Sequence, residues 1–191
     1  LPWVYLLISP KTMPKSSLVI TGGHHTGALE VAKSFSASGV PVVWFGHRHS
    51  LWGDPSDSAE YREVTAAGIP FYDLWAGKFY RTLNPLKLIR IPYGFLQAFH
   101  YLITLKPSGI VSFGGYLAVP TVICGWLLGI PSVTHEQTVV GGWANRLIAL
   151  FAQKIAVSWP ESLKYYPQHK TILTGLPLRP EILKMKSMGL N

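Results

Sequence analysis

The sequence predicts an α/β protein with a Rossmann-like parallel sheet and helices on both of its faces. Short runs rich in β-branched and aromatic residues alternate with longer runs of helical periodicity over residues 17–174. Several of the short runs are apolar throughout, which is typical of strands covered on both faces. Strands that alternate with helices form βαβ units, and such units build a parallel sheet.

The expected strands cover 17–21, 41–46, 69–74, 109–113, 131–135, 154–158 and 170–174, and the expected helices 26–38, 92–106, 117–128 and 142–152. In the helix at 26–38, the spacing of Leu29, Ala32 and Phe35 gives one apolar side. In the helix at 92–106, the pattern predicts a core face and a solvent face. The core face would hold Phe95, Phe99, Leu102 and Ile103, and the solvent face Tyr93, Gln97, His100 and Thr104.

One domain is expected, over residues 14–183. Residues 1–13 read as a leader, either disordered or upstream read-through, with a short membrane-touching arm as the alternative. Residues 184–191 read as a tail. The chain has no repeats and no low-complexity linker.

The composition points to an anionic partner. Lys and Arg number 17 against 9 Asp and Glu, a formal net charge of +8, while 48% of the residues are hydrophobic. Dense Lys/Arg clusters, the usual mark of a nucleic-acid binder, are missing, and the 13% aromatic content favours a membrane or a lipid. The single cysteine, Cys124, fits a buried position in a protein of a reducing compartment.

Two glycine-rich turns follow predicted strands. Thr21-Gly22-Gly23-His24 precedes a helix whose first N–H groups favour an anion, although a tight turn without a ligand is the alternative. It is neither a dinucleotide fingerprint nor a P-loop, so a nucleotide-dependent dehydrogenase is remote. The second turn, Phe113-Gly114-Gly115-Tyr116, lies on the same sheet edge, and Tyr116 suits packing and substrate contact equally.

Two polar segments end later strands. His135-Glu136-Gln137-Thr138 is followed by Asn145, and a carboxylate beside an imidazole orients it or tunes its pKa. A loop-stabilising hydrogen-bond network is the alternative for this segment. The last strand leads to Arg179, which is either a bidentate phosphate ligand or a solvated side chain beside a proline turn.

In this order and spacing, the segments TGGH, FGGY, HEQTVVGGWANR and TGLPLRPEIL resemble the N-terminal half of the MurG family. The resemblance covers about residues 15–183. It implies one half of a GT-B architecture in an inverting hexosyltransferase. Such enzymes transfer N-acetylglucosamine from UDP-GlcNAc to lipid-linked N-acetylmuramyl-pentapeptide (lipid I to lipid II) in peptidoglycan synthesis, a process tied to cell division. No metal or other cofactor is implied.

The resemblance assigns roles residue by residue. His24 would be the catalytic base or a diphosphate contact, and Glu136 would orient it or bind the acceptor. The donor or diphosphate would contact Thr21, Gly22, Gly23, Thr138 and Arg179. The acceptor would contact Gly114, Gly115, Tyr116, His135, Gln137 and Asn145.

The chain also departs from the family pattern. Thr138 and Leu176 stand where the family has asparagine, and His25-Thr26-Gly27 replaces apolar and proline residues after the first turn. These changes put donor contacts in doubt and keep other lipid acceptors, such as diacylglycerol, open. We expect the family's second, donor-binding domain to be missing here, either because the sequence is truncated or because a separate donor-domain subunit supplies it. A non-catalytic membrane anchor that recruits such a subunit is the alternative function.

A basic and apolar stretch suggests membrane contact. No Asp or Glu occurs between Leu74 and Thr134, and basic residues within 78–91 are interleaved with aromatic and aliphatic ones. This mixture suits an anionic bilayer surface, with a partly buried loop as the alternative. The expected membrane contacts are Lys78, Arg81, Lys87 and Arg90. The location implied is peripheral, on the cytoplasmic face of the plasma membrane.

Overall fold

The computed structural model describes residues 17–49, 56–77, 89–179 and 181–182. Seven parallel strands form one sheet in the order β3-β2-β1-β4-β5-β6-β7. They are β1 (Leu18–Thr21), β2 (Val42–Gly46), β3 (Phe71–Asp73), β4 (Gly109–Ser112), β5 (Ser132–Glu136), β6 (Lys154–Val157) and β7 (Thr171–Leu173). The predicted Rossmann-like fold class is confirmed.

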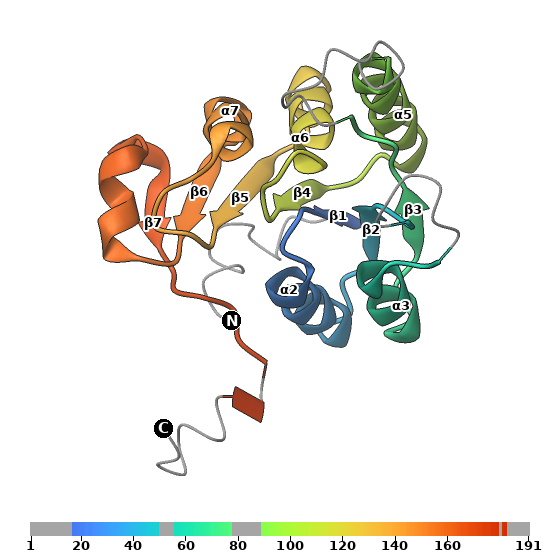
Figure 1. Ribbon diagram of the computed structural model, residues 1–191, viewed down its shortest axis with the longest axis horizontal. Coiled ribbons are helices and arrows are strands. Elements are labelled where there is room, and N and C mark those ends of the chain that lie inside the picture. The colour runs from blue at the N-terminus through green and yellow to red at the C-terminus, as the bar shows by residue number, and fades with distance from the viewer. Residues whose placement is uncertain (1–16, 50–55, 78–88, 180, 183–191) are drawn as a thin grey trace.

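Helices cover both faces of the sheet (Figure 1). On one face lie α2 (His25–Ala37) and α3 (Ala59–Ala66). On the other lie α5 (Arg90–Leu105), α6 (Ala118–Leu127) and α7 (Trp143–Phe151). Two short 3-10 helices, η2 (Pro160–Tyr165) and η3 (Gln168–Lys170), precede β7.

Two apolar cores result from the alternation of side chains along the strands. Leu18 and Ile20 of β1 pack with the α2 side, whereas Val19 between them packs with the α5–α6 side. All of these side chains are fully buried. Because β1 is an internal strand buried on both faces, it fixes the place of the turn that follows it at the carboxyl edge of the sheet.

The predicted faces of α5 are partly wrong. Leu102 is buried as predicted, but Phe99 is 38% exposed and Ile103 is 46% exposed. The helix packs instead through Gly94 and Ala98, which are buried. A Cβ on Gly94 would come within 2.9 Å of the Ala76 backbone, so small residues bring this helix close to the segment after β3. Leu96, Phe99 and Ile103 are exposed.

One further difference concerns a short helix. Helix α3 was not among the predicted helices, because only Val64 of it is buried and its apolar pattern is weak. Its start is nevertheless capped, since the Ser58 hydroxyl accepts a hydrogen bond from the Tyr61 N–H at 3.1 Å. The proposed leader and tail lie outside the described residues.

Candidate functional site

The two glycine turns interlock at the carboxyl edge of the sheet. The Gly23 N–H donates to the Gly114 carbonyl at 3.0 Å, and the Phe113 N–H donates to the Thr21 carbonyl at 2.7 Å. Gly22 has a φ of 144°, and a Cβ there would lie 2.7 Å from the Phe113 backbone. Only glycine therefore allows the two turns to approach this closely.

Asn145, in the first turns of α7, fastens the second glycine turn. Its Oδ1 accepts a hydrogen bond from the Gly115 N–H at 2.8 Å. Gly114 and Gly115 adopt left-handed backbone angles, with φ of 71° and 78°. A Cβ on Gly114 would overlap the Asn145 side chain. The glycines at this turn are thus required by both backbone angle and space.

Glu136 ends β5 and is 2% exposed. Its Oε1 accepts hydrogen bonds from the Thr138 N–H at 2.9 Å and the Thr138 hydroxyl at 2.7 Å. Its Oε2 accepts from Asn145 Nδ2 at 2.6 Å and from the Tyr166 hydroxyl at 2.9 Å. Burial alone would raise the pKa of Glu136, but these hydrogen bonds outweigh it and hold the pKa below its ordinary value. The residue is a buried, fully engaged carboxylate.

His135 is also buried, at 1% exposed. Its Nε2 lies 3.0 Å from the Gly175 carbonyl and donates to it, which links β5 to the turn after β7. Its ring packs against Phe113, with centroids 5.3 Å apart. Burial lowers the pKa of His135, so the neutral ring is favoured.

His24 occupies the N-cap position of α2 and is exposed. Its Nδ1 lies 3.4 Å from the Phe113 carbonyl, so the side chain leans over the second glycine turn. No side chain caps α2 within the described residues, which leaves the first N–H groups of the helix available to a ligand. The helix dipole adds a partial positive charge at this point.

Gln137 and Thr21 flank this helix start. A Cβ on Gly27 would lie 2.7 Å from Gln137 Nε2, so that amide packs directly on the first turn of α2. Gln137 Nε2 and the Thr21 hydroxyl are both buried, and neither has a hydrogen-bond partner in the part of the chain that the structure describes. The site thus gathers backbone and amide N–H donors around one helix start.

Comparison with known proteins identifies the fold's lineage. The model of the glycosyltransferase family 28 N-terminal domain matches residues 20–157. The chain belongs to glycosyltransferase family 28. The matched range includes both glycine turns, the strand end at Glu136 and Asn145, so the interlocked site lies wholly within the family 28 domain.

Curated relatives are named for one reaction. The UDP-N-acetylglucosamine–N-acetylmuramyl-(pentapeptide) pyrophosphoryl-undecaprenol N-acetylglucosamine transferase 2 of Bacillus cereus is 34% identical over 87% of this chain and 47% of its own length. The enzyme named transferase 3 in Bacillus thuringiensis is 41% identical over the same shares. The crystal structure of MurG from Acinetobacter baumannii matches with a TM-score of 0.67 and 26% identity, over 83% of this chain and 45% of that one. The chain spans about half the length of these relatives.

In this family 28 domain, most of the predicted site residues come together. The first glycine turn, from Thr21 to His24, lies beside Gly114 and Gly115 of the second. Asn145 joins the second turn to Glu136, which in turn is hydrogen-bonded to Thr138. His135 lies beneath this assembly and Gln137 at the start of α2. Tyr116 is half-buried against the core under α5 and α6, and burial raises its pKa, with the Glu60 carboxylate adding to the effect.

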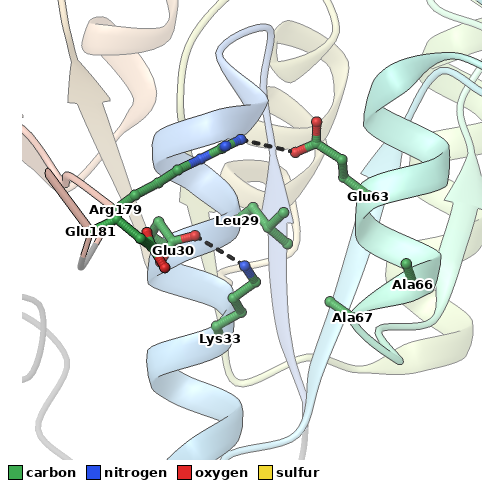
Figure 2. A pocket seen from close by; sticks show the side chains of 8 residues that line it. All are labelled: Leu29, Glu30, Lys33, Glu63, Ala66, Ala67, Arg179 and Glu181. Carbon is green, nitrogen blue, oxygen red and sulfur yellow. Dashed lines mark hydrogen bonds and ion pairs between the residues drawn. The ribbon is translucent and has the colours of Figure 1, made fainter.

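Arg179 lies apart from the interlocked turns. Its guanidinium pairs with Glu63 of α3 at 3.3 Å, and Figure 2 shows Arg179 crossing α2 to reach this carboxylate. His25 Nε2 approaches the same carboxylate at 3.8 Å. The groove beside them measures about 560 Å³. It is lined by Leu29, Glu30, Lys33, Glu63, Ala66, Ala67, Arg179 and Glu181. In this structure Arg179 is held by an acidic partner rather than presented to the glycine turns.

Sequence reasoning did not single out Tyr166. This tyrosine follows η2, is 7% exposed and donates to Glu136 from thirty residues downstream. The sequence offers one signal for such a residue: a buried carboxylate needs hydrogen-bond donors. This signal does not indicate which residues supply the donors.

Of the four residues predicted to contact a membrane, the structure describes only Arg90. Lys78, Arg81 and Lys87 lie outside the described residues. Arg90 begins α5, and its guanidinium lies over the Trp75 ring, 5.3 Å from the centroid. Among the described helices, none combines the length and the apolarity needed to cross a bilayer.

Proposed function

We propose that this chain is the acceptor-binding half of an inverting N-acetylglucosaminyltransferase. The reaction transfers N-acetylglucosamine from UDP-GlcNAc to polyprenyl-diphosphate-linked N-acetylmuramyl-pentapeptide in peptidoglycan synthesis. The observation that carries the proposal is the interlock of two glycine turns and a buried carboxylate at one sheet edge. The names of relatives with 34% and 41% identity support the choice of donor and acceptor.

The start of α2 suits the diphosphate of the acceptor. Uncapped N–H groups, the helix dipole and the Gln137 amide all offer positive partial charge within one turn. Gly23 is exposed and lacks a side chain, so a ligand approaches the uncapped N–H groups of α2 without a steric barrier from this residue. The site therefore binds an anion through the backbone, with His24 at its rim.

His24 is our choice for the proton-transfer group. Among the histidines of the turns it is exposed, whereas His135 is buried and held by Gly175. In a single displacement, the acceptor hydroxyl forms a bond to the anomeric carbon as the bond to UDP breaks, and the base takes the hydroxyl proton. Glu136 has both oxygens engaged, which favours a positioning role for it over proton transfer.

The substitution His24→Ala tests this function. With a donor-binding half present, we expect turnover to fall by about 100-fold or more, as is usual for a lost general base. The readout is transfer of radiolabelled N-acetylglucosamine to lipid I. His169→Ala is the control, because His169 is exposed in η3, away from the turns. Unchanged transfer in His24→Ala would remove His24 from the mechanism, and no transfer by the parent protein would refute the assigned reaction.

We further propose that the outer surface of α5 docks on an anionic membrane at the cytoplasmic face. Leu96 is 70% exposed and Ile89 is 65% exposed, and Tyr93, Phe99 and Ile103 join them on the same helix. The neighbouring α6 exposes Trp126 and Leu127 near its end. The absence of acidic residues between Leu74 and Thr134 removes repulsion from anionic lipids. Such a surface would bring a lipid-linked acceptor to the glycine turns.

A further inference from the structure

Tyr166 is a buried polar group that the proposed reaction does not use. It lies between η2 and η3, and its hydroxyl donates to Glu136 Oε2 at 2.9 Å. Space is made for this contact by Gly141, where a Cβ would overlap both the Tyr166 hydroxyl and the Glu136 carboxylate. The loop after β5 is thus shaped to admit the tyrosine.

From Tyr166, hydrogen bonds run without a break to the first glycine turn. The Glu136 carboxylate accepts from Tyr166 and, at 2.6 Å, from Asn145 Nδ2. Asn145 Oδ1 then accepts from the Gly115 N–H at 2.8 Å. The adjacent Gly114 carbonyl accepts from the Gly23 N–H at 3.0 Å. One tyrosine hydroxyl is therefore connected to the start of α2 through three strand ends.

We propose that Tyr166 is a positioning residue, whose hydroxyl holds Glu136 and, through Asn145, sets the two glycine turns. What those turns bind rests on the function proposed above. The hydroxyl does this because a buried carboxylate needs donors on both oxygens, and a missing donor leaves charge unsatisfied. With a phenyl ring in its place, the volume is filled but Oε2 keeps a single donor.

The charged and titratable surroundings of Glu136 make the effect measurable. Its direct partners are Thr138, Asn145 and Tyr166, while His135 precedes it on β5 and Arg146 of α7 acts on Tyr166. Removing one hydrogen bond from a buried carboxylate favours its protonated form. A protonated Glu136 accepts more weakly from Asn145. As the pH is lowered, the second glycine turn should therefore loosen at a higher pH in a variant that lacks the Tyr166 hydroxyl than in the parent chain.

The test compares Tyr166→Phe with Tyr165→Phe in the isotope-labelled 191-residue chain. Tyr165 is the matched control, because it is the adjacent tyrosine and is 41% exposed. By NMR, we expect the amide signals of Gly115 and Gly23 to move in Tyr166→Phe only. We also expect the carboxyl carbon of Glu136 to titrate about one pH unit higher in that variant. A tyrosine that merely fills space would change neither signal.

A double-mutant cycle keeps the proposal testable if Tyr166→Phe is poorly stable. Glu136→Gln retains the shape of the side chain and removes its charge. If Tyr166 acts through Glu136, adding Tyr166→Phe to Glu136→Gln moves the Gly115 signal less than it does in the parent chain. Additive shifts, or a Tyr166→Phe spectrum that matches Tyr165→Phe, would overturn the proposal.

An activity measurement separates this inference from the proposed function. In a protein with its donor-binding half, Tyr166→Phe should raise the KM for the lipid acceptor about fivefold, with a smaller effect on kcat, because the turns are held less well. A change in kcat alone counts against positioning. If the NMR shifts occur but the parent protein transfers no sugar, the positioning role stands and the assigned reaction falls.

Discussion

At the residue scale, Gly114 and Gly39 share a left-handed backbone and differ in their surroundings. Their φ angles are 71° and 78°. A Cβ on Gly39 would meet nothing within 4 Å, whereas one on Gly114 would overlap Asn145. The pair therefore separates the cost of the backbone angle from the cost of lost space and lost hydrogen bonds.

We expect Gly39→Ala to lower the free energy of unfolding by about 1 kcal/mol, from backbone strain alone. Gly114→Ala should lower it by about 2 kcal/mol more, because Asn145 must leave both Gly115 and the buried Glu136 carboxylate. Urea denaturation of the two variants measures the difference. Equal losses would mean that the Asn145 bridge contributes nothing to stability.

The sequence predicted where Glu136 lies in the fold but not all of the residues that bind it. A polar run at the end of an apolar strand places Glu136 at the sheet edge, because the carboxyl ends of parallel strands share that edge. Beyond the adjacent Thr138, the donors to Glu136 come from Asn145 and Tyr166, nine and thirty residues downstream, and strand periodicity does not predict them. The alternative of a loop-stabilising network therefore describes the Glu136 contacts well. The catalytic and binding roles of the site residues stay predictions.

At the element scale, α5 shows why periodicity misjudged one face. A helix that is apolar nearly all round has two candidate core faces, and the pattern favoured the larger side chains. Packing followed Gly94 and Ala98, since close approach to the chain after β3 needs small residues. All seven predicted strands are present, because short apolar runs bounded by glycine and proline identify strands well.

The exposed apolar face of α5 makes a membrane prediction. We expect Leu96→Glu to weaken binding to anionic vesicles, measured by sedimentation, by about 30-fold, since a buried leucine contributes on the order of 2 kcal/mol. Ile172→Glu on β7 is the control, because Ile172 is 40% exposed at the far edge of the sheet. Vesicles of neutral lipid should bind the parent chain less well than anionic ones. Equal binding by Leu96→Glu and the parent would remove α5 from the docking surface.

At the scale of the whole molecule, the strand order determines where the site lies. The chain runs outward from β1 to β2 and β3, then returns to place β4 on the other side of β1. The two glycine turns follow β1 and β4, so they flank the point where the order reverses, which is where doubly wound sheets bind ligands. The alternation of strands and helices in the sequence predicted a parallel sheet. The order of the strands within that sheet was known only from the structure.

Acid stability of the molecule should depend on His135. Burial depresses the pKa of His135 below the ordinary 6.5, so just below pH 6.5 this histidine binds a proton in the unfolded chain but not in the folded chain. Stability is therefore greatest above pH 6.5 and falls as the pH drops toward the folded-state pKa, by at most about 1.4 kcal/mol per pH unit. We expect His135→Gln to flatten the loss of unfolding free energy between about pH 7 and 5.

The control for that measurement is His169→Gln, because His169 is exposed. Its unfolding free energy should follow the parent curve over the same interval. A His135→Gln curve as steep as that of the parent would show that another group supplies the pH dependence.

The tie from Gly23 to Gly114 and on to Asn145 has a thermodynamic consequence. Loops that are ordered before a ligand arrives lose little conformational freedom when it binds. Calorimetry of a diphosphate at this edge should then record a small entropic penalty and little change in heat capacity beyond that from desolvation of the ligand. During a catalytic cycle, we therefore expect this half to move as a rigid body while its glycine turns keep their conformation.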